Sequence, residues 1–176
     1  MTAAHPSLRR NADDVVTDLY RAHYRTLVRL AAMLLHNVGE AEEVVQDSFV
    51  AMHGRWDRIK DPDKALAYLR QTVVNRSRSA LRHRAVEIKH LPKPAPDGAS
   101  AEHAALRSEE HLVVRTAIAG LPQRQREAVV LRYYLDLSEA QTAATMGISR
   151  GAAKSHTSRG MSALRHALGH ALEQQS

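Results

Sequence analysis

The 176-residue chain contains no cysteine, one phenylalanine and one tryptophan, and few glycines and prolines. The absence of cysteine excludes a disulfide framework and thiolate-ligated metal sites, and it fits a reducing cytoplasm. No apolar run approaches the roughly 18 residues of a membrane span. The N-terminus carries arginines without the apolar segment of a signal peptide. We therefore expect a cytoplasmic protein without membrane insertion.

The residues that are abundant favour helices. Alanine, leucine, arginine, glutamate and glutamine dominate, and no run of alternating β-branched residues indicates a sheet. Apolar periodicity and the proline-rich stretch between its two blocks predict an all-α protein with two small helical domains and a flexible linker. The expected boundaries are a loose tail (1–13), a first domain (14–84), the linker (85–105) and a second domain (106–172).

The second domain contains the most informative stretch of the chain. Ser138 and Gln141 form a capping-box pattern that predicts a helix over 139–146. Gly147 can end that helix in the left-handed conformation, and Ser149 can cap the next one. Two helices joined by a glycine-containing turn, the second basic at its start, are typical of a helix-turn-helix. An ordinary hairpin of two helices remains the alternative interpretation.

The first domain is predicted to contain helices over 14–36, 40–54 and 63–84. The second of these has an acidic face formed by Glu40, Glu43 and Asp47. Acidic residues in a first turn suit the helix dipole, but Asp47 lies in the middle of the helix. The pattern is consistent either with a binding surface or with a merely solvated face.

The helix predicted over 63–84 is strongly basic. From Lys64 to Arg84 it carries six lysines and arginines and no acid, a charge equal to the net +6 of the whole chain. Like charges repel one another along a helix, so we expect this face to point outward toward a phosphate backbone. Neutralisation by acids elsewhere in the fold is the alternative.

The motifs of catalysis are absent from the sequence. His166 and His170 are four residues apart, but position 167 is alanine, so the zinc-hydrolase pattern is missing. There is no nucleotide-binding glycine loop, and no acidic trio is placed to hold two Mg²⁺ ions. We expect neither an enzyme, nor a bound cofactor, nor a metal site.

Two blocks of sequence together resemble the extracytoplasmic-function (ECF, group 4) sigma factors, members of the sigma-70 family of bacterial RNA polymerase. The first block carries Glu40-Ala-Glu-Glu-Val-Val-Gln-Asp-Ser-Phe49 and Ala67-Tyr-Leu-Arg70, with Asn75 and the arginines after it. The second carries Leu121-Pro-x-Arg-Gln-Arg-Glu127, Leu131-Arg-Tyr-Tyr134, Leu137-Ser-Glu139 and Lys154-Ser155. Their order on two blocks joined by a short linker makes the resemblance highly specific.

The resemblance implies three groups of site residues. The residues that would dock on the polymerase clamp coiled coil are Glu43, Gln46 and Asp47. Those that would capture a flipped base of the −10 element and hold its phosphates are Asn75, Arg76, Arg78 and Arg82. Those on the helix that would enter the major groove at the −35 element are Ser149, Arg150, Lys154, Ser155, His156 and Arg159.

The implied partners are core RNA polymerase, through its clamp and flap, and promoter DNA; an anti-sigma protein, which holds many members of the family, is a further candidate. The chain departs from the family pattern at Ala152, Ala153 and His156, which indicates a shifted −35 preference. A stand-alone helix-turn-helix regulator is the main alternative, and it leaves the acidic and basic faces unused. A recombinase-like enzyme is a second alternative, and it lacks a nucleophile or metal-binding carboxylates.

Overall fold

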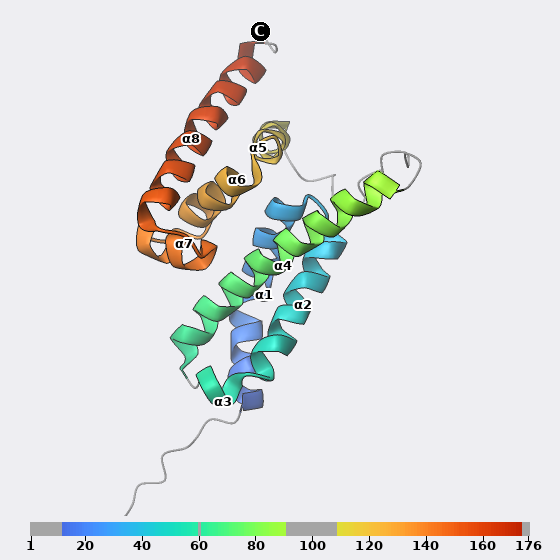
Figure 1. The fold of residues 1–176 in the computed structure, drawn as a ribbon, viewed down its shortest axis with the longest axis vertical. Helices are drawn as coiled ribbons and strands as arrows, with labels where there is room; N and C mark the ends of the chain where they lie inside the picture. Colours follow the sequence, from blue (N-terminus) through green and yellow to red (C-terminus); the bar gives the residue numbers. More distant parts are fainter. Residues whose placement is uncertain (1–11, 60, 91–108, 174–176) are drawn as a thin grey trace, which may run out of the picture.

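The computed structural model describes residues 12–59, 61–90 and 109–173, and within these ranges the protein is all-α (Figure 1). The first half contains α1 (Ala12–Leu35), α2 (Val38–His53), the short α3 (Trp56–Ile59) and α4 (Pro62–His90). The second half contains α5 (Glu109–Ala119), α6 (Gln123–Val129), the π-helical turn η2 (Val130–Tyr134), α7 (Glu139–Met146) and α8 (Arg150–Glu173). The predicted tail, apart from Ala12 and Asp13, and most of the predicted linker lie outside the described residues.

In the first half, α1, α2 and α4 pack against one another. The apolar stripes predicted from the sequence meet here, and their fully buried members include Leu30, Val45, Met52, Leu69 and Val73. Full burial of each such side chain contributes about 1.5–3 kcal/mol relative to leaving it exposed. This core holds α4 in place, with its remaining faces available to other partners.

The break between α1 and α2 comes where the sequence predicts it, near Asn37. His36 has a φ of 58° and ends α1, and the Asn37 side chain then accepts a hydrogen bond from the Glu40 amide at 3.0 Å. The short helix α3, which was not predicted, follows α2 at Trp56, whose buried ring covers the end of the core.

Helix α4 is longer than predicted, because it runs through the residues assigned to the start of the linker. The expected end at Arg84 is wrong by six residues, since α4 ends at His90. Residues 85–90 contain no proline or glycine, and the first residue disfavoured in a helix is Leu91, which precedes Pro92. The basic segment therefore belongs to one long, continuous helix.

The helix-turn-helix is confirmed in detail. Ser138 and Gln141 form both bonds of the capping box, at 3.1 and 2.8 Å. Gly147 ends α7 in the left-handed conformation with a φ of 66°. Before α7, helix α6 ends at Val129 and the chain widens into η2, where the Leu135 amide bonds to the Val130 carbonyl at 3.3 Å.

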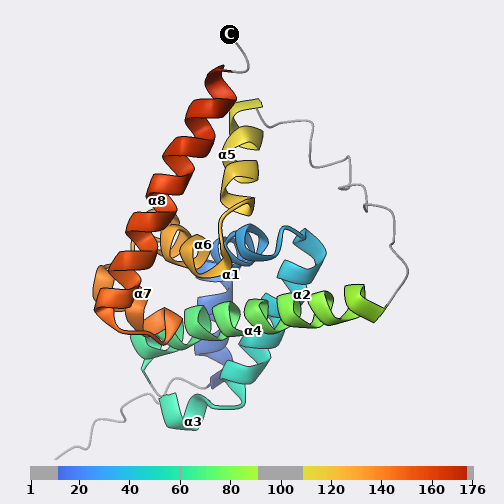
Figure 2. The same ribbon diagram turned by 45° about the horizontal axis from the view of Figure 1, so that its top comes forward.

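The two halves are in contact in this arrangement. Helix α7 packs against α4, and α1 contacts α5, α6 and η2. Both views show the α7 end of the second half beside α4 (Figures 1 and 2). Leu131 and Met146 from the second half join the same buried apolar cluster as the core of the first.

Gly160 sets how closely α8 approaches α6. A Cβ at this position would lie 2.6 Å from Val129 Cγ2 and 3.1 Å from the Gln125 carbonyl oxygen. We expect Gly160→Ala to lower the free energy of unfolding by about 1–3 kcal/mol, because the helices must separate. Gly169→Ala on the same helix meets no atom within 4 Å and is the matched control. Urea denaturation of both variants measures this, and equal stabilities would contradict the packing argument.

His36 lies where both halves bring arginines together. Desolvation, and then the charges of Arg126, Arg84 and Arg115, lower its pKa from 6.5 to about 4. Between these two pH values the unfolded chain binds a proton that the folded chain does not, so stability falls as the pH falls through this range.

The variant His36→Asn tests this pH dependence. Asparagine tolerates the positive φ and does not titrate. We expect the wild type to lose more stability than His36→Asn between about pH 7 and about pH 4.5 in urea titrations. If the free energy of unfolding falls equally in the two proteins, protonation of His36 does not contribute to the pH dependence of stability.

Candidate nucleic-acid interface

The residues predicted to contact the −10 element all lie on α4. Asn75 is exposed, and with Arg76 it lines a hollow of about 360 Å³. The other residues that line it are Arg55, Tyr68, Gln71, Thr72 and Ser79. The Arg55 guanidinium carbon lies 5.9 Å from the centre of the Tyr68 ring. The hollow thus combines an aromatic ring, two cations and two amides, a set suited to an unstacked base beside a phosphate.

The prediction of an unpaired basic face on α4 is wrong in this arrangement. Acids neutralise four of its six cations: Lys64 pairs with Asp61 at 3.9 Å, Arg76 with Asp47 at 3.1 Å, Arg78 with Glu127 at 2.7 Å, and Arg84 with Glu40. The physical reason is that three of these acids, which lie on α2 and α6, reach α4 in space although they are distant in sequence. Only Asp61 is a neighbour of its partner along the chain. Arg82 is exposed and donates to Ser79 Oγ at 3.0 Å.

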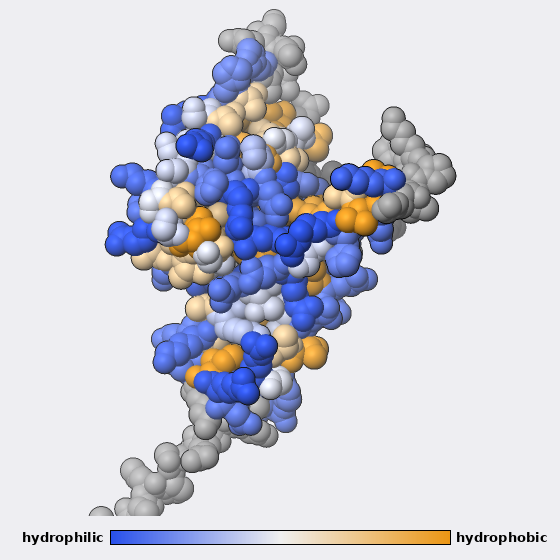
Figure 3. Space-filling view, viewed as in Figure 1, coloured by the Kyte–Doolittle hydropathy of each residue, from blue (hydrophilic) through white to orange (hydrophobic). Residues whose placement is uncertain are grey.

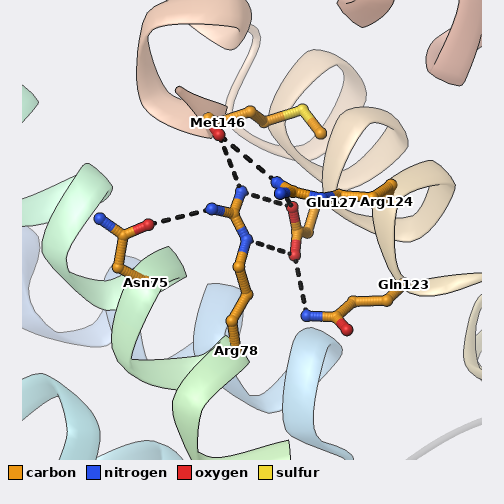
Figure 4. Close-up of polar contacts among 6 residues, drawn as sticks. All are labelled: Asn75, Arg78, Gln123, Arg124, Glu127 and Met146. Carbon is orange, nitrogen blue, oxygen red and sulfur yellow. Dashed lines mark hydrogen bonds and ion pairs between the residues drawn. The ribbon is translucent and has the colours of Figure 1, made fainter. Parts of the chain in front are cut away.

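Arg78 is the most deeply engaged of these arginines (Figure 4). Its Nε and Nη2 donate to the two carboxylate oxygens of Glu127 at 2.8 and 2.7 Å. Nη2 also donates to the Met146 carbonyl at 3.1 Å, and Nη1 donates to Asn75 Oδ1 at 3.0 Å. Side-chain exposure is 14% for Arg78 and 2% for Glu127. A residue predicted to bind DNA therefore lies between the two halves.

The predicted polymerase-docking residues lie on the solvent side of α2. Glu43, Gln46 and Asp47 are all exposed, and Asp47 keeps 66% of its side-chain surface despite its bond to Arg76. Glu40, from the same acidic face, turns instead toward Arg84. Two residues of this acidic face, Glu40 and Asp47, thus form ion pairs with arginines of α4.

The predicted −35 residues lie on the first three turns of α8. Ser149 Oγ accepts a hydrogen bond from the Ala152 amide at 3.2 Å and caps the helix, as predicted. Ala153 and Gly160 are buried against the rest of the second half. The exposed members are Ser149, Arg150, Lys154, Ser155 and Arg159, whereas His156 is half-buried. Arg150 is held loosely by Glu139 at 3.9 Å, so this basic surface remains accessible.

Two charged residues of α6, the buried Glu127 and the half-buried Arg126, were not assigned a role from the sequence. Glu127 receives Arg78, and it also accepts from Gln123 at 3.2 Å and Arg124 at 3.4 Å. Arg126 donates to four carbonyls: Ile118, Ala119 and Leu121 of its own half, and Leu34 at 2.9 Å across the interface. Desolvation lowers the pKa of Arg126. The Arg-Gln-Arg-Glu string was visible in the sequence, but its partners were not.

Three further observations concern metal binding, membrane spans and surface hydropathy in the described residues. No group of three or more potential metal-binding side chains occurs in them, although His166 and His170 approach to 3.3 Å between their Nε2 atoms. None of the described helices has the length and apolar content to cross a bilayer. The face shown in Figure 3 is largely hydrophilic, with small, separate hydrophobic patches.

The family models match the two halves separately. The model of sigma-70 region 2 matches residues 19–86, and that of sigma-70 region 4 matches residues 111–164. These matches fall on α1–α4 and on α5–α8, in the order in which the two halves follow each other in the chain.

Relatives match along most of the chain. The RNA polymerase sigma-E factor of Streptomyces avermitilis is 32% identical over 151 residues, covering 84% of this chain and 82% of that protein. The ECF RNA polymerase sigma factor SigM of Mycobacterium tuberculosis is 29% identical over 170 residues, covering 97% of this chain and 84% of that protein.

Solved structures share the fold. The sigma factor RpoE of Bartonella quintana, crystallised with the anti-sigma factor NepR, superposes with a TM-score of 0.69 at 23% identity. The superposition covers 87% of this chain and 96% of RpoE. CnrH, in complex with the cytosolic domain of CnrY, gives a TM-score of 0.67 over 92% of this chain. With its two sigma-70 regions in order and relatives matched over most of its length, the chain belongs to the extracytoplasmic-function sigma factors of the sigma-70 family.

Proposed function

We propose that this sigma factor directs core RNA polymerase to promoters by reading the −10 element with α4 and the −35 element with α8. The observation that carries the proposal is the coincidence of the region 2 and region 4 matches with the two halves that bear these surfaces. It acts as a binding subunit without catalysis of its own, in the cytoplasm where the polymerase works.

The hollow on α4 is the proposed −10 site. Extruding a base from the stack costs a few kcal/mol, which contacts in the pocket must offset. We assign stacking to Tyr68 and hydrogen bonding to Asn75, which line the same hollow. Arg76, Arg78 and Arg82 would hold the neighbouring phosphates, two of them after exchanging a carboxylate partner for DNA.

The start of α8 is the proposed −35 site. Its exposed Arg150, Lys154 and Arg159 suit the phosphates and base edges of a major groove. Ser149, Ser155 and His156 complete the proposed set. Within the described residues we identify a single helix-turn-helix, so we propose that specificity also requires the DNA-binding surface on α4.

The acidic face of α2 is the proposed docking site for the polymerase clamp. Glu43, Gln46 and Asp47 offer exposed carboxylates and an amide to a basic partner. A polymerase that holds both halves fixes the distance between the two weak DNA-binding surfaces on α4 and α8. A promoter whose −10 and −35 elements are the same distance apart contacts both surfaces at once, so both contacts contribute to its binding free energy. The region 4 half would also meet the flap, and an anti-sigma protein is a further proposed partner, as in the solved structure of RpoE with NepR.

In vitro transcription with core polymerase on a genomic DNA library tests the proposal. The purified chain should redirect the polymerase to a small set of start sites that share two spaced elements. A stand-alone helix-turn-helix regulator would instead bind DNA without retaining polymerase in a pull-down. Failure to redirect the polymerase to any start site would overturn the proposed function.

Asp47→Arg tests the docking face. We expect binding to core polymerase to weaken by at least about tenfold, because a cation replaces an acid opposite a basic partner. Arg76→Gln is the matched control, since it breaks the same 3.1 Å ion pair but keeps the acid. A pull-down or titration with core polymerase measures both variants. Wild-type affinity in Asp47→Arg would count against the docking assignment.

Lys154→Ala tests the −35 helix. In the reconstituted holoenzyme, we expect weaker promoter binding and a salt dependence whose log–log slope is smaller by about one. Arg165→Ala is the control, because it removes an exposed cation from a later turn of the same helix. A slope identical to wild type would remove Lys154 from the phosphate contacts.

A further inference from the structure

His166 and His170 face each other near the C-terminal end of α8. Their Nε2 atoms lie 3.3 Å apart, and their rings meet edge to face with centroids 4.4 Å apart. Both residues are exposed, and Figure 1 shows the last turns of α8 extending beyond the neighbouring helices. Neither histidine belongs to the surfaces assigned above to DNA or to the polymerase clamp, so the proposed function gives this pair no role.

The distance between the two Nε2 atoms is the one that a single zinc ion requires. Zinc binds an imidazole nitrogen at about 2.0–2.1 Å, and its ligands are arranged tetrahedrally. Two nitrogens at this bond length, with an angle of about 109° at the ion, lie about 3.3–3.4 Å apart. One ion can therefore be bound by both rings with little movement of either side chain.

The contact between the two rings uses the same lone pairs that a metal ion binds. One ring carries a proton on Nε2 and donates it, and the Nε2 lone pair of the other ring accepts it. A metal ion takes the place of this proton when both rings carry their protons on Nδ1 instead. Because the rings already point toward each other, little side-chain freedom is lost when the ion binds.

The spacing of the pair is that of the histidine ligands in helical zinc sites. In the zinc-hydrolase pattern, two histidines four residues apart bind the ion, and a glutamate directly after the first acts as the general base. Position 167 is alanine, so the base is missing while the two ligands are present. No group of three or more metal-binding side chains occurs in the part of the chain that the structure describes. The pair is therefore suited to binding an ion, with water in the open positions, and not to hydrolysis.

We propose that His166 and His170 form a chelating site for a divalent transition-metal ion of the zinc type at the C-terminal end of α8. Imidazole is a ligand of zinc, copper and nickel, whereas Mg²⁺ prefers oxygen, so the site excludes Mg²⁺. The bound ion links one turn of the helix to the next. Because it chelates only the helical conformation, it stabilises the end of α8.

Calorimetric titration of the full chain with Zn²⁺ tests the site. The chain carries no polyhistidine tag, which would bind the same ion, and the buffer does not coordinate zinc. We expect one ion per chain, and an affinity at least about tenfold weaker in His166→Gln and in His170→Gln, because each variant leaves a single ligand. His83→Gln is the matched control, since it removes an exposed histidine of α4. Mg²⁺ at the same concentrations should give no binding heat.

A rescue variant tests the spacing of the two histidines. Adding Ser162→His to His170→Gln places an imidazole four residues before His166, at an exposed position of the same helix. Side chains four residues apart are neighbours on a helix surface, so the new pair can chelate in the same way. We expect the affinity for Zn²⁺ to return to within about threefold of wild type.

Hydrogen exchange measures the effect of the ion on α8 directly. Zn²⁺ should slow amide exchange over residues 166–173 by at least about threefold in the wild type, because the ion binds only the closed helix. The same residues of His166→Gln should exchange at equal rates with and without Zn²⁺. Helix α2 is the internal reference, and its exchange should not change in either protein.

Three outcomes would overturn the proposal. The first is an unchanged affinity in both single variants, and the second is one ion bound by two chains, which would show a site shared between copies. The third is failure of Ser162→His to restore the binding that His170→Gln has lost. None of these measurements involves polymerase or DNA, so their outcome is independent of the proposed function.

Discussion

The arrangement of the two halves depends on one buried carboxylate, that of Glu127. It is almost inaccessible to water and lies among Arg78, Arg124 and Gln123. An ionised acid in such a place requires donors, because desolvation without them is costly. Two donors come from its own helix and the strongest comes from α4. The fold of the second half and its contact with the first are therefore coupled through this side chain, as they are through Arg126, which donates to carbonyls of both halves.

The helix-turn-helix shows how local chemistry prepares a surface for a distant partner. A capping box starts α7, a left-handed glycine ends it, and a serine cap starts α8. Gly160 then allows α8 to approach α6 so closely that a methyl group would not fit. These features fix the direction of α8 with few residues. The exposed face of its first turns is consequently free to vary in sequence without loss of the fold.

The sequence predicted what depends on neighbours along the chain and missed what depends on neighbours in space. Apolar periodicity located the long helices, and caps located the turn at Gly147. The short helix at Trp56, the π-helical turn at Val130 and the true end of α4 at His90 were not predicted. The basic face of α4 was predicted to be unpaired, because nothing in a one-dimensional pattern tells which acid from α2 or α6 reaches which arginine. On α8 the residues predicted to contact the −35 element are exposed except for the half-buried His156, whereas Arg78 on α4 is largely buried.

The ion pair between Asp47 and Arg76 has a consequence for how the two proposed ligands affect each other's binding. The proposed roles give one of its members to the polymerase and the other to the promoter. While the pair persists, Asp47 competes with DNA for Arg76, and Arg76 competes with the polymerase clamp for Asp47. When the clamp binds Asp47, Arg76 loses its counter-ion. The free Arg76 guanidinium can then pair with a DNA phosphate. Because this coupling is reciprocal, binding of the polymerase favours binding of the promoter, and binding of the promoter favours binding of the polymerase.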